Sequence, residues 1–547
     1  AGRIRVDNTN SLYTEKLYAT SNPTLLENSK KGKYTETRGE ERQTYGDVML
    51  NLSKTFKEKF SLDAHIGASI KDNRFDELSV YGPIAGAPNI FNVVNLDKSQ
   101  KKTPKTGWHE QTQSFFYSLE LGWKSQLFVT TTGRNDWASQ LANSPQKSFF
   151  YPSVGVSWLP SSTFNFPEKF NYLKIRASWA SVANPFPREL TIATHPYDDT
   201  ISGWDDKSNY PIGQLYPERT KTWELGFDAR FLHGFTLSAS WYRADTYNQT
   251  FNPNLSASSG YSDIYIQTGH VRNTGVEASL GYDHQWKNWN WNSQFTFSWN
   301  KNKIIELCKE WYNPITEETI TMNRLQISKL GRAKFILKEG GSMGDLYSTT
   351  DLRRDDKGNI EIDEGGNVVV EDNLPDMKLG SVFPDYNLAW RNSVSWKNLN
   401  LGFLVTARIG GIVNSLTQAN MDLFGVSEAT AAARDAGGAL VNGRSLVNPE
   451  TWYTAIASQG GIPQYYTYSA TNVRLQELSL GYTIPRKWLH NICSITVSFV
   501  GRNLWMMYCK APFDPEAVAS TNNFYQGMDY FMMPSTRNLG FNINIKF

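Results

Sequence analysis

Side chains that commonly perform catalysis or bind metals are scattered along this chain. Its seven histidines, at positions 65, 109, 195, 233, 270, 284 and 490, show no HExxH motif and no metal-ligand spacing. Cys308, Cys493 and Cys509 show no CxxC pair, which disfavours a disulfide framework or a zinc site. The sequence also contains no GxSxG elbow and no Walker loop. We therefore expect no catalytic residue, no metal site, no cofactor and no enzymatic activity.

One acidic segment raises the question of calcium. Asp355, Asp356, Glu361, Asp363 and Glu364 surround a Lys-Gly-Asn sequence at 357–359, and alternating carboxylates near a glycine suit hard cations. The spacing departs from DxDxDG, and a distal glutamate in register is missing. We therefore favour a hairpin whose tip is 357–359 over a calcium site.

Aromatic side chains with neighbouring amides and carboxylates are concentrated in the long connections. Such groups can stack on sugars or grip peptides, although packing among the loops themselves is the plainer explanation for any single residue. The candidate contacts to a ligand or to a covering partner are Trp204, Tyr210, Tyr261, Trp311, Tyr312, Trp452, Tyr453, Tyr465 and Tyr466.

The elements that would position these residues are strands, because apolar and polar residues alternate with period 2. In the last twelve residues, Leu539, Phe541, Ile543 and Ile545 share one face with the terminal Phe547. An aromatic C-terminus on such a strand is the usual assembly signal of outer-membrane barrels, so Phe547 is assigned that role. Between 473 and 482 the alternation changes phase, which predicts a β-bulge near 476–477.

We place sixteen strands along the chain, and long and short connections alternate between them. They lie near 3–9, 47–56, 60–71, 111–123, 126–135, 149–158, 172–183, 222–231, 235–244, 272–284, 288–303, 386–396, 398–409, 472–484, 492–504 and 536–547. The long connections are expected at about 10–46, 72–110, 184–221, 245–271, 304–385, 410–471 and 505–535. Short turns on one side and long loops on the other are typical of a transmembrane antiparallel β-barrel.

Composition agrees with that class. The 547 residues carry 55 Lys+Arg against 53 Asp+Glu, which disfavours a nucleic-acid partner. No run approaches the ~18 consecutive apolar residues of a membrane helix. Tryptophans near predicted strand ends suit girdles at the two membrane interfaces. They are Trp123, Trp137, Trp158, Trp286, Trp289, Trp396, Trp488 and Trp505.

Several stretches resemble the SusC-like TonB-dependent transporters. They are HVRNTGVEASLGYD at 270–283, GVSEATAAARDAGG at 425–438, NVRLQELSLGYTIPRKWL at 472–489, VSFVGRNLW at 497–505, DPEAV at 514–518 and the terminal FNINIKF. The resemblance covers essentially residues 1–547 as the C-terminal part of the barrel. It places 501–504 at the end of the penultimate strand and 514–516 at the start of the next loop, and it carries no ligand-binding role to either segment.

The resemblance implies active import of oligosaccharides or oligopeptides through the outer membrane of a Gram-negative bacterium. The implied partners are outer-membrane lipid, a SusD-like surface lipoprotein that acts as a lid, and the TonB complex, which would act through a plug absent from this sequence. It also raises a dimer of transporter–lid pairs. Family barrels have twenty-two strands, so these sixteen are expected to be the last sixteen, with an unpaired edge if they stood alone.

Three other functions remain open at this point. A complete sixteen-stranded passive porin is favoured by the even strand count but disfavoured by the long loops at 304–385 and 410–471. An outer-membrane hydrolase lacks a nucleophile–histidine–acid grouping in the sequence. A soluble β-rich carbohydrate-binding module would not explain the alternation of loop lengths.

Overall fold

The computed structural model describes most of the chain in two compact units. The described residues are 1–20, 30–188, 190, 197–198, 203–204, 209–210, 215–251, 263–313, 317–520 and 525–547. The first unit comprises 1–156, 179–221 and 248–267, and the second comprises 157–178, 222–247 and 268–547. Each unit is considered by itself below.

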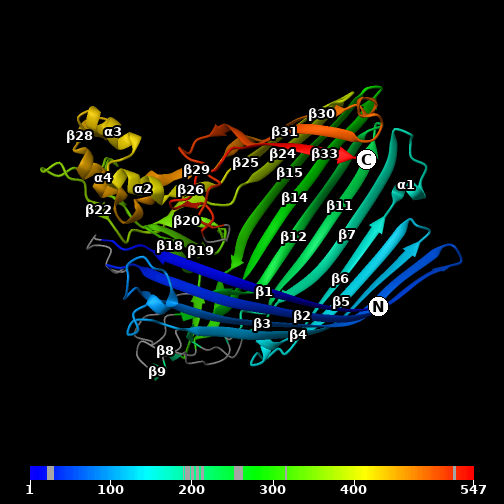
Figure 1. The fold of residues 1–547 in the computed structure, drawn as a ribbon, viewed down its shortest axis with the longest axis horizontal. Coiled ribbons are helices and arrows are strands. Elements are labelled where there is room, and N and C mark those ends of the chain that lie inside the picture. The colour runs from blue at the N-terminus through cyan, green and yellow to red at the C-terminus, as the bar shows by residue number, and fades with distance from the viewer. Residues whose placement is uncertain are drawn as a thin grey trace. The chain divides into compact units, whose positions relative to one another are not determined.

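All sixteen predicted strands are present, and they follow one another in a single pairing order (Figure 1). They are β1 (Gly2–Leu17), β2 (Lys33–Phe56), β3 (Phe60–Pro83), β4 (Lys105–Trp123), β5 (Leu127–Ala138), β6 (Phe149–Trp158), β7 (Phe170–Asn184), β11 (Glu218–Phe231), β12 (Phe235–Phe251), β14 (Ile266–Trp286), β15 (Trp289–Glu306), β24 (Tyr386–Trp396), β25 (Leu399–Ile409), β30 (Asn472–Ile484), β31 (Ser494–Cys509) and β33 (Asn538–Lys546). Pairing is antiparallel throughout β1–β5 and from β14 to β33. The all-β fold class is therefore confirmed.

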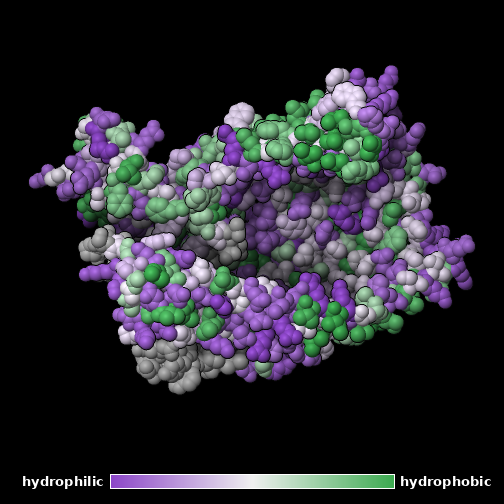
Figure 2. All heavy atoms as spheres, in the orientation of Figure 1, coloured by the Kyte–Doolittle hydropathy of each residue, from purple (hydrophilic) through white to green (hydrophobic). Residues whose placement is uncertain are grey.

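One face of these strands leaves its apolar side chains exposed, and we call it the outer face. On β3 it holds the even-numbered residues 60–70, of which Phe60, Ile66 and Ile70 are exposed. The eight predicted girdle tryptophans are exposed as well. Figure 2 shows the hydrophobic residues gathered over the part of the second unit where Figure 1 labels β31 and β33. An apolar band of about eleven residues per strand is the length that a tilted strand needs to cross a bilayer.

Tight turns join the strands at one end, as predicted. Lys57 and Glu58 connect β2 to β3, Lys124 and Ser125 connect β4 to β5, and Lys397 begins the turn from β24 to β25. All five residues have positive φ, which the tight connections of two or three residues use to reverse the chain while matching the twist of the flanking strands.

The strands extend farther toward the long-loop end than the sequence predicted. Residues 10–17, 33–46 and 72–83 were assigned to loops, yet they continue β1, β2 and β3 in unbroken register. Polar residues predominate there and the few apolar ones, such as the adjacent Leu12 and Tyr13, do not alternate, so the period-2 apolar signal disappears although backbone pairing continues. The expected loops 10–46 and 72–110 are correspondingly shorter, and 501–504 lies within β31 instead of ending it.

The predicted bulge is confirmed. Leu404 of β25 pairs with Glu477 of β30, whereas the next residue, Val405, pairs with Leu475, so Gln476 is the extra residue. A bulge reverses which face the following residues occupy. Arg474 and Glu477 consequently point to the same, inner face of the sheet, although one is even-numbered and the other odd-numbered.

Small elements occupy the long loops. The strands are β8 (Tyr197–Asp198), β9 (Gly203–Trp204), β10 (Asn209–Tyr210), β13 (Asp263–Ile264), β16 (Cys308–Asn313), β17 (Glu318–Met322), β18 (Arg324–Leu330), β19 (Ala333–Lys338), β20 (Asp345–Ser348), β21 (Asp351–Leu352), β22 (Val370–Glu371), β23 (Met377–Ser381), β26 (Ile412–Ser415), β27 (Ala439–Val441), β28 (Ser445–Val447), β29 (Thr467–Ser469) and β32 (Met528–Asp529). The helices are α1 (Pro160–Thr163), α2 (Leu416–Leu423), α3 (Glu428–Asp435), α4 (Pro449–Ala457) and α5 (Pro463–Tyr466). Within the described residues, none of these helices has the length and apolar character needed to cross a membrane.

Candidate functional site

The inner face of the sheet carries polar side chains that bond across strands. In the first unit, Arg134 donates from Nε to Asp136 Oδ1 at 2.7 Å and from Nη2 to Ser114 Oγ at 2.7 Å. The hydroxyl of Tyr151 donates to the other oxygen of Asp136, which is nearly buried. His65 and Asn51 form a second link, 2.8 Å between Nδ1 and Oδ1. This face can therefore contact hydrophilic ligands along its length.

The second unit repeats the arrangement on its own inner face. Arg176 donates to Asp228 at 2.7 Å, and Ser238 donates to the other carboxylate oxygen at 2.7 Å. Tyr242 donates to Asn300 Oδ1 at 3.2 Å. Gly226 packs against the Arg176 guanidinium, and a Cβ there would lie 2.8 Å from it. Paired charges of this kind leave the lining polar without a strong net sign.

The loop between β25 and β30, residues 410–471, folds into a small helical region that we call the loop lobe (Figure 1). Ser415, Ser427 and Asn448 cap α2, α3 and α4 by accepting backbone N–H groups, which replaces the hydrogen bonds missing at a helix start. Ile456, Ala457 and other apolar side chains pack into a buried core. That core also contains Leu352 and Val368, so the lobe packs together with part of the loop before β24.

Four of the predicted aromatic contacts lie in this lobe. Tyr466 is 2% exposed and donates its hydroxyl to Asp422 Oδ2 at 3.0 Å; burial, with the Asp422 charge second, raises the pKa of Tyr466. The rings of Trp452 and Tyr465 meet edge to face at 5.9 Å. These three side chains stabilise the lobe by packing. Tyr453 differs, because it also lines a surface groove.

That groove has a volume of about 460 Å³ between α2, α3 and α4. Its lining residues are Asp422, Leu423, Phe424, Gly425, Thr430, Arg434, Asn448, Pro449, Glu450 and Tyr453. Arg434 is held by a 3.0 Å hydrogen bond from Nη1 to the Gly425 carbonyl. An aromatic ring, a guanidinium and carboxylates around one groove can bind a hydroxyl-rich or amide-rich ligand.

The preceding loop, residues 307–385, contains a four-stranded sheet of β18, β19, β20 and β23. Arg324 binds Asp376 through two hydrogen bonds of 2.6 and 2.8 Å, and Lys338 lies 2.9 Å from the same carboxylate. The hydrogen bond from Arg324 holds the pKa of Asp376 well below its usual range. Burial, then the charges of Asp345 and Asp376, raises the pKa of Tyr347 to about 12.

The acidic segment forms the predicted hairpin. Arg354 pairs with Ile360, and Gly358 at the tip has a φ of +83°. Asp355 accepts hydrogen bonds from the Asn359 side chain and from the backbone N–H groups of residues 357 and 359, and the Asn359 side chain, followed by its backbone N–H, lowers the pKa of Asp355. Asp363 makes the same turn eight residues later, accepting from residues 365 and 367. Both carboxylates hold their own turns, while calcium binding itself remains untested.

The C-terminal motifs meet around one arginine, a cluster that sequence reasoning missed. Arg474 is 4% exposed and binds Asp514 through contacts of 2.8 and 3.2 Å, with Glu516 at 3.1 Å. Asn472 Oδ1 accepts from its Nε at 3.2 Å. A sequence signal was present, because two of the quoted motifs, 472–489 and 514–518, supply these residues. The cluster ties the loop after β31 to the inner face of β30.

That loop then reaches the lobe. Asp529 in β32 accepts a 2.6 Å hydrogen bond from Ser415, the residue that caps α2. The backbone N–H of Phe531 donates to Thr417 at 2.7 Å. The loop after β31 is therefore fixed at both places, to β30 by Arg474 and to α2 by Asp529.

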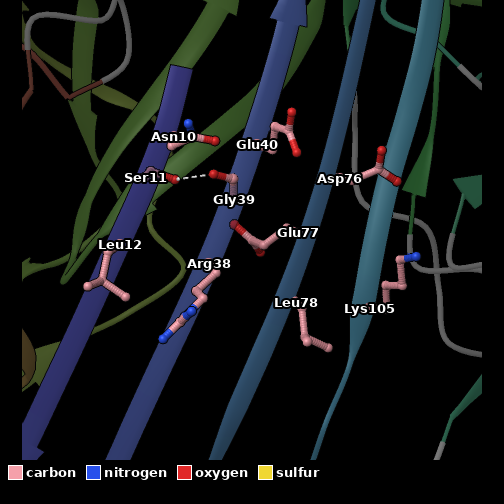
Figure 3. Close-up of a pocket in the computed structure, with 10 residues that line it drawn as sticks. All are labelled: Asn10, Ser11, Leu12, Arg38, Gly39, Glu40, Asp76, Glu77, Leu78 and Lys105. Atoms are coloured by element: carbon pink, nitrogen blue, oxygen red, sulfur yellow. Dashed lines mark hydrogen bonds between the residues drawn. The ribbon is translucent and has the colours of Figure 1, made fainter. Parts of the chain in front are cut away.

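An open trough lies across β1–β4 in the first unit (Figure 3). It has a volume of about 560 Å³. Most of its lining side chains are in phase with the outer-face residues. Along these strands Leu12, Arg38, Leu78 and Lys105 form one row, beside Glu40 and Asp76 in the next. The lining holds two cations, Arg38 and Lys105, against three carboxylates, Glu40, Asp76 and Glu77, so the trough has no excess of positive charge.

The structure does not gather the remaining predicted contacts. Trp204 and Tyr210 belong to the short strands β9 and β10, and Tyr261 lies outside the described residues. Trp311 and Tyr312 are in β16, where Tyr312 is exposed. Phe547 is exposed beyond β33. Ligand or lid binding at all these positions, and the assembly role of Phe547, stay predictions.

Known proteins are similar to this chain over most of its length. A family model described as "TonB dependent receptor-like, beta-barrel" matches residues 3–504. The chain is 26% identical over 577 residues to TonB-dependent receptor P3 of Formosa agariphila, covering 95% of this chain and 55% of that protein. It is 21% identical over 404 residues to TonB-dependent receptor SusC of Bacteroides thetaiotaomicron, covering 69% and 38%. It thus spans about half the length of the relative P3.

Solved structures show the same fold. The chain aligns with the RagAB peptide transporter with a TM-score of 0.78 at 18% identity, covering 100% of this chain and 60% of that one. The RagAB peptide importer in an "open-open" state gives the same TM-score. The resemblance of the sequence to SusC-like barrels, which rested on the motifs quoted above, is therefore confirmed.

Proposed function

Because the chain belongs to the TonB dependent receptor-like β-barrel family, we propose that it forms the barrel of an active importer of oligosaccharides or oligopeptides. Such barrels are outer-membrane proteins of Gram-negative bacteria, and the exposed apolar band places these strands in that membrane. The observation that carries the proposal is the pairing of a polar, charge-balanced inner face with long loops that hold folded structure of their own.

In this proposal, energy for import comes from the TonB complex acting through a plug, and a SusD-like lipoprotein closes the loop end. The loop lobe and the loop after β31 supply a firm rim against which a lid can close, because the lobe packs on a buried core and the loop after β31 is held by Arg474 and Asp529. The polar inner face then provides hydrogen-bonding positions along the path. Catalysis plays no part.

Uptake by cells that carry the natural full-length protein tests the proposal. Labelled mixtures of oligopeptides and of oligosaccharides are offered to cells with and without a functional TonB. We expect accumulation of one class, abolished when TonB is absent. Equal accumulation without TonB, together with rapid swelling of proteoliposomes in small sugars, would establish the passive porin instead.

A matched pair of variants tests the groove. Tyr453→Ala removes the aromatic wall, whereas Leu446→Ala truncates an exposed residue of β28 that does not line the groove. We expect the first variant to weaken uptake about tenfold, since one stacked aromatic contributes on the order of 1–2 kcal/mol, and the second to leave it unchanged. Equal uptake in both variants would remove the groove from the path.

A further inference from the structure

Cationic side chains gather on the outer face of β12, β14 and β15, near the long-loop end of these strands, which Figure 1 shows side by side. We call Arg243, Arg272, Lys301 and Lys303 the basic strip. Arg243 follows Trp241 by two residues on β12, and Lys301 and Lys303 follow Trp299 on β15. Successive residues of one face are two apart, so these cations continue the face that carries the tryptophans.

The register fixes the level of the basic strip. Val276 pairs with Trp299, Thr274 with Lys301, and Arg272 with Lys303. The tight turn at 287–288 closes the other end of this hairpin, and Trp289 begins the apolar band there. From Trp289 to Trp299 is the span that a tilted strand needs to cross the hydrocarbon. Lys301 and Lys303 therefore lie ~7 and ~13 Å farther along the strand, beyond the aromatic interface.

The charges of the strip are only partly compensated. Asp245 accepts from Arg243 at 2.8 Å, from Arg272 at 2.7 Å and lies 2.5 Å from His270 Nε2. Tyr247 stacks on His270 at 4.5 Å, which holds the imidazole in place. One carboxylate thus orients two guanidinium groups. Among the described residues of β12, β14 and β15 at this level of the outer face, the second carboxylate is Glu306, which pairs opposite His270.

The side chains of Lys301 and Lys303 form no ion pair or hydrogen bond within the part of the chain that the structure describes, although their backbones pair with Thr274 and Arg272. The strip as a whole sets four permanent cations against two carboxylates. The trough on β1–β4 occupies a comparable outer-face position in the first unit, but there Arg38 and Lys105 face Glu40 and Asp76. An excess of positive charge is therefore a property of this strip and not of every charged row above the apolar band.

We propose that the basic strip binds the phosphate-bearing headgroup of an anionic lipid in the outer leaflet of the outer membrane. The side chains face outward, away from the polar inner path, and lie where lipid headgroups begin. Guanidinium groups held by Asp245 present fixed N–H donors to phosphate oxygens, and the two lysines add mobile positive charge. Each basic residue near an anionic lipid surface strengthens binding about fivefold. The inference requires the membrane location but not the identity of the imported ligand.

The test uses the full-length transporter purified in a neutral detergent and titrated with diphosphoryl lipid A in mixed micelles, followed by native mass spectrometry. The variant is K301Q/K303Q, which cannot unpair Asp245. The matched control is K287Q/K397Q, which removes the same charge from tight turns at the opposite end of the strands. Lipid A without phosphates is titrated in parallel.

We expect K301Q/K303Q to weaken binding of diphosphoryl lipid A about 20- to 30-fold, with K287Q/K397Q close to the parent protein. Dephosphorylated lipid A should bind the parent protein weakly. Equal binding by K301Q/K303Q and the parent, an equal loss in K287Q/K397Q, or equal affinity for the dephosphorylated lipid would each overturn the proposal. TonB-dependent uptake by K301Q/K303Q is measured separately, so that failure of the lipid site is distinguished from failure of the importer.

Discussion

The sheet and the loop lobe use the same kinds of side chain in opposite ways. On β33 the apolar residues Leu539, Phe541 and Ile543 point outward and remain exposed on the protein. In the lobe, Ile462 and Tyr466 are buried against other protein side chains. Apolar burial is thus supplied by lipid in one region and by the chain itself in the other, so the two regions should respond differently to substitution, detergent and pH.

Arg474 is the clearest exception to this difference between sheet and lobe. It belongs to the sheet strand β30, yet its side chain is buried like those of the lobe. Arg474→Met leaves Asp514 buried without its partner, and we expect the loop after β31 to lose about 3–5 kcal/mol against local unfolding. Hydrogen exchange across 510–535 measures this loss. Arg502→Met is the control, because its pair with Glu477 is exposed and is worth at most about 1 kcal/mol. Similar exchange in both variants would contradict the assignment.

Placing a charge on the outer face of the sheet tests whether lipid covers the apolar side chains there. Ile543→Arg places a guanidinium in the apolar band, and we expect the folded barrel to lose about 2–4 kcal/mol in reversible unfolding from lipid. Asn542→Arg, one residue away on the inner face, should cost much less. If the two variants unfold alike, the assignment of faces on β33 is wrong.

Removing a helix cap tests the stability of the lobe alone, with a smaller expected change in free energy. Asn448 accepts the backbone N–H groups of residues 450 and 451 at the start of α4. Asn448→Ala should cost about 1 kcal/mol of lobe stability, and Asn448→Gly only a few tenths. Limited proteolysis within 410–471 reports the difference, and the denaturant midpoint of the barrel should remain constant. A shift of that midpoint would show that lobe and sheet unfold together.

Falling pH gradually destabilises the four-stranded sheet of β18, β19, β20 and β23, which we call the loop sheet. The pKa of Asp376 is lowered in the folded state, so its pairing with Arg324 contributes stability at pH values above the unfolded pKa, near 3.8. That contribution is lost as pH falls from about 4 toward the lower folded pKa. We expect the protection factors of backbone amides in β18 and β19, which correct for the intrinsic pH dependence of exchange, to fall as pH is lowered from about 4 toward 2. Asp376→Asn should exchange faster at pH 6 already and show a flatter dependence.

Predictability from sequence follows the same division. Period-2 patterns predicted all sixteen strands and the bulge at Gln476, because lipid-facing and polar residues alternate between neighbours in the sequence. The same signal ends where β2 and β3 leave the apolar band, so their outer halves were assigned to loops. The lobe was not predictable in this way, since Tyr466 and Asp422 meet only after the loop has folded. Arg474 and Asp514 are likewise far apart in sequence. The motifs that contain them indicate the family but not the contact between the two side chains.

The buried core that the loop lobe shares with residues 352–370 has a consequence for assembly. During insertion of the strands, the tight turns involve only two or three residues each, whereas the lobe and the loop sheet must be moved to the far side of the membrane. A lobe that had already packed Ile462 and Tyr466 would be too bulky to pass through a bilayer with the strands. We therefore expect translocation to precede lobe folding, and lobe folding then to oppose backward movement of β24, β25 and β30, so that insertion becomes directional without an external energy source.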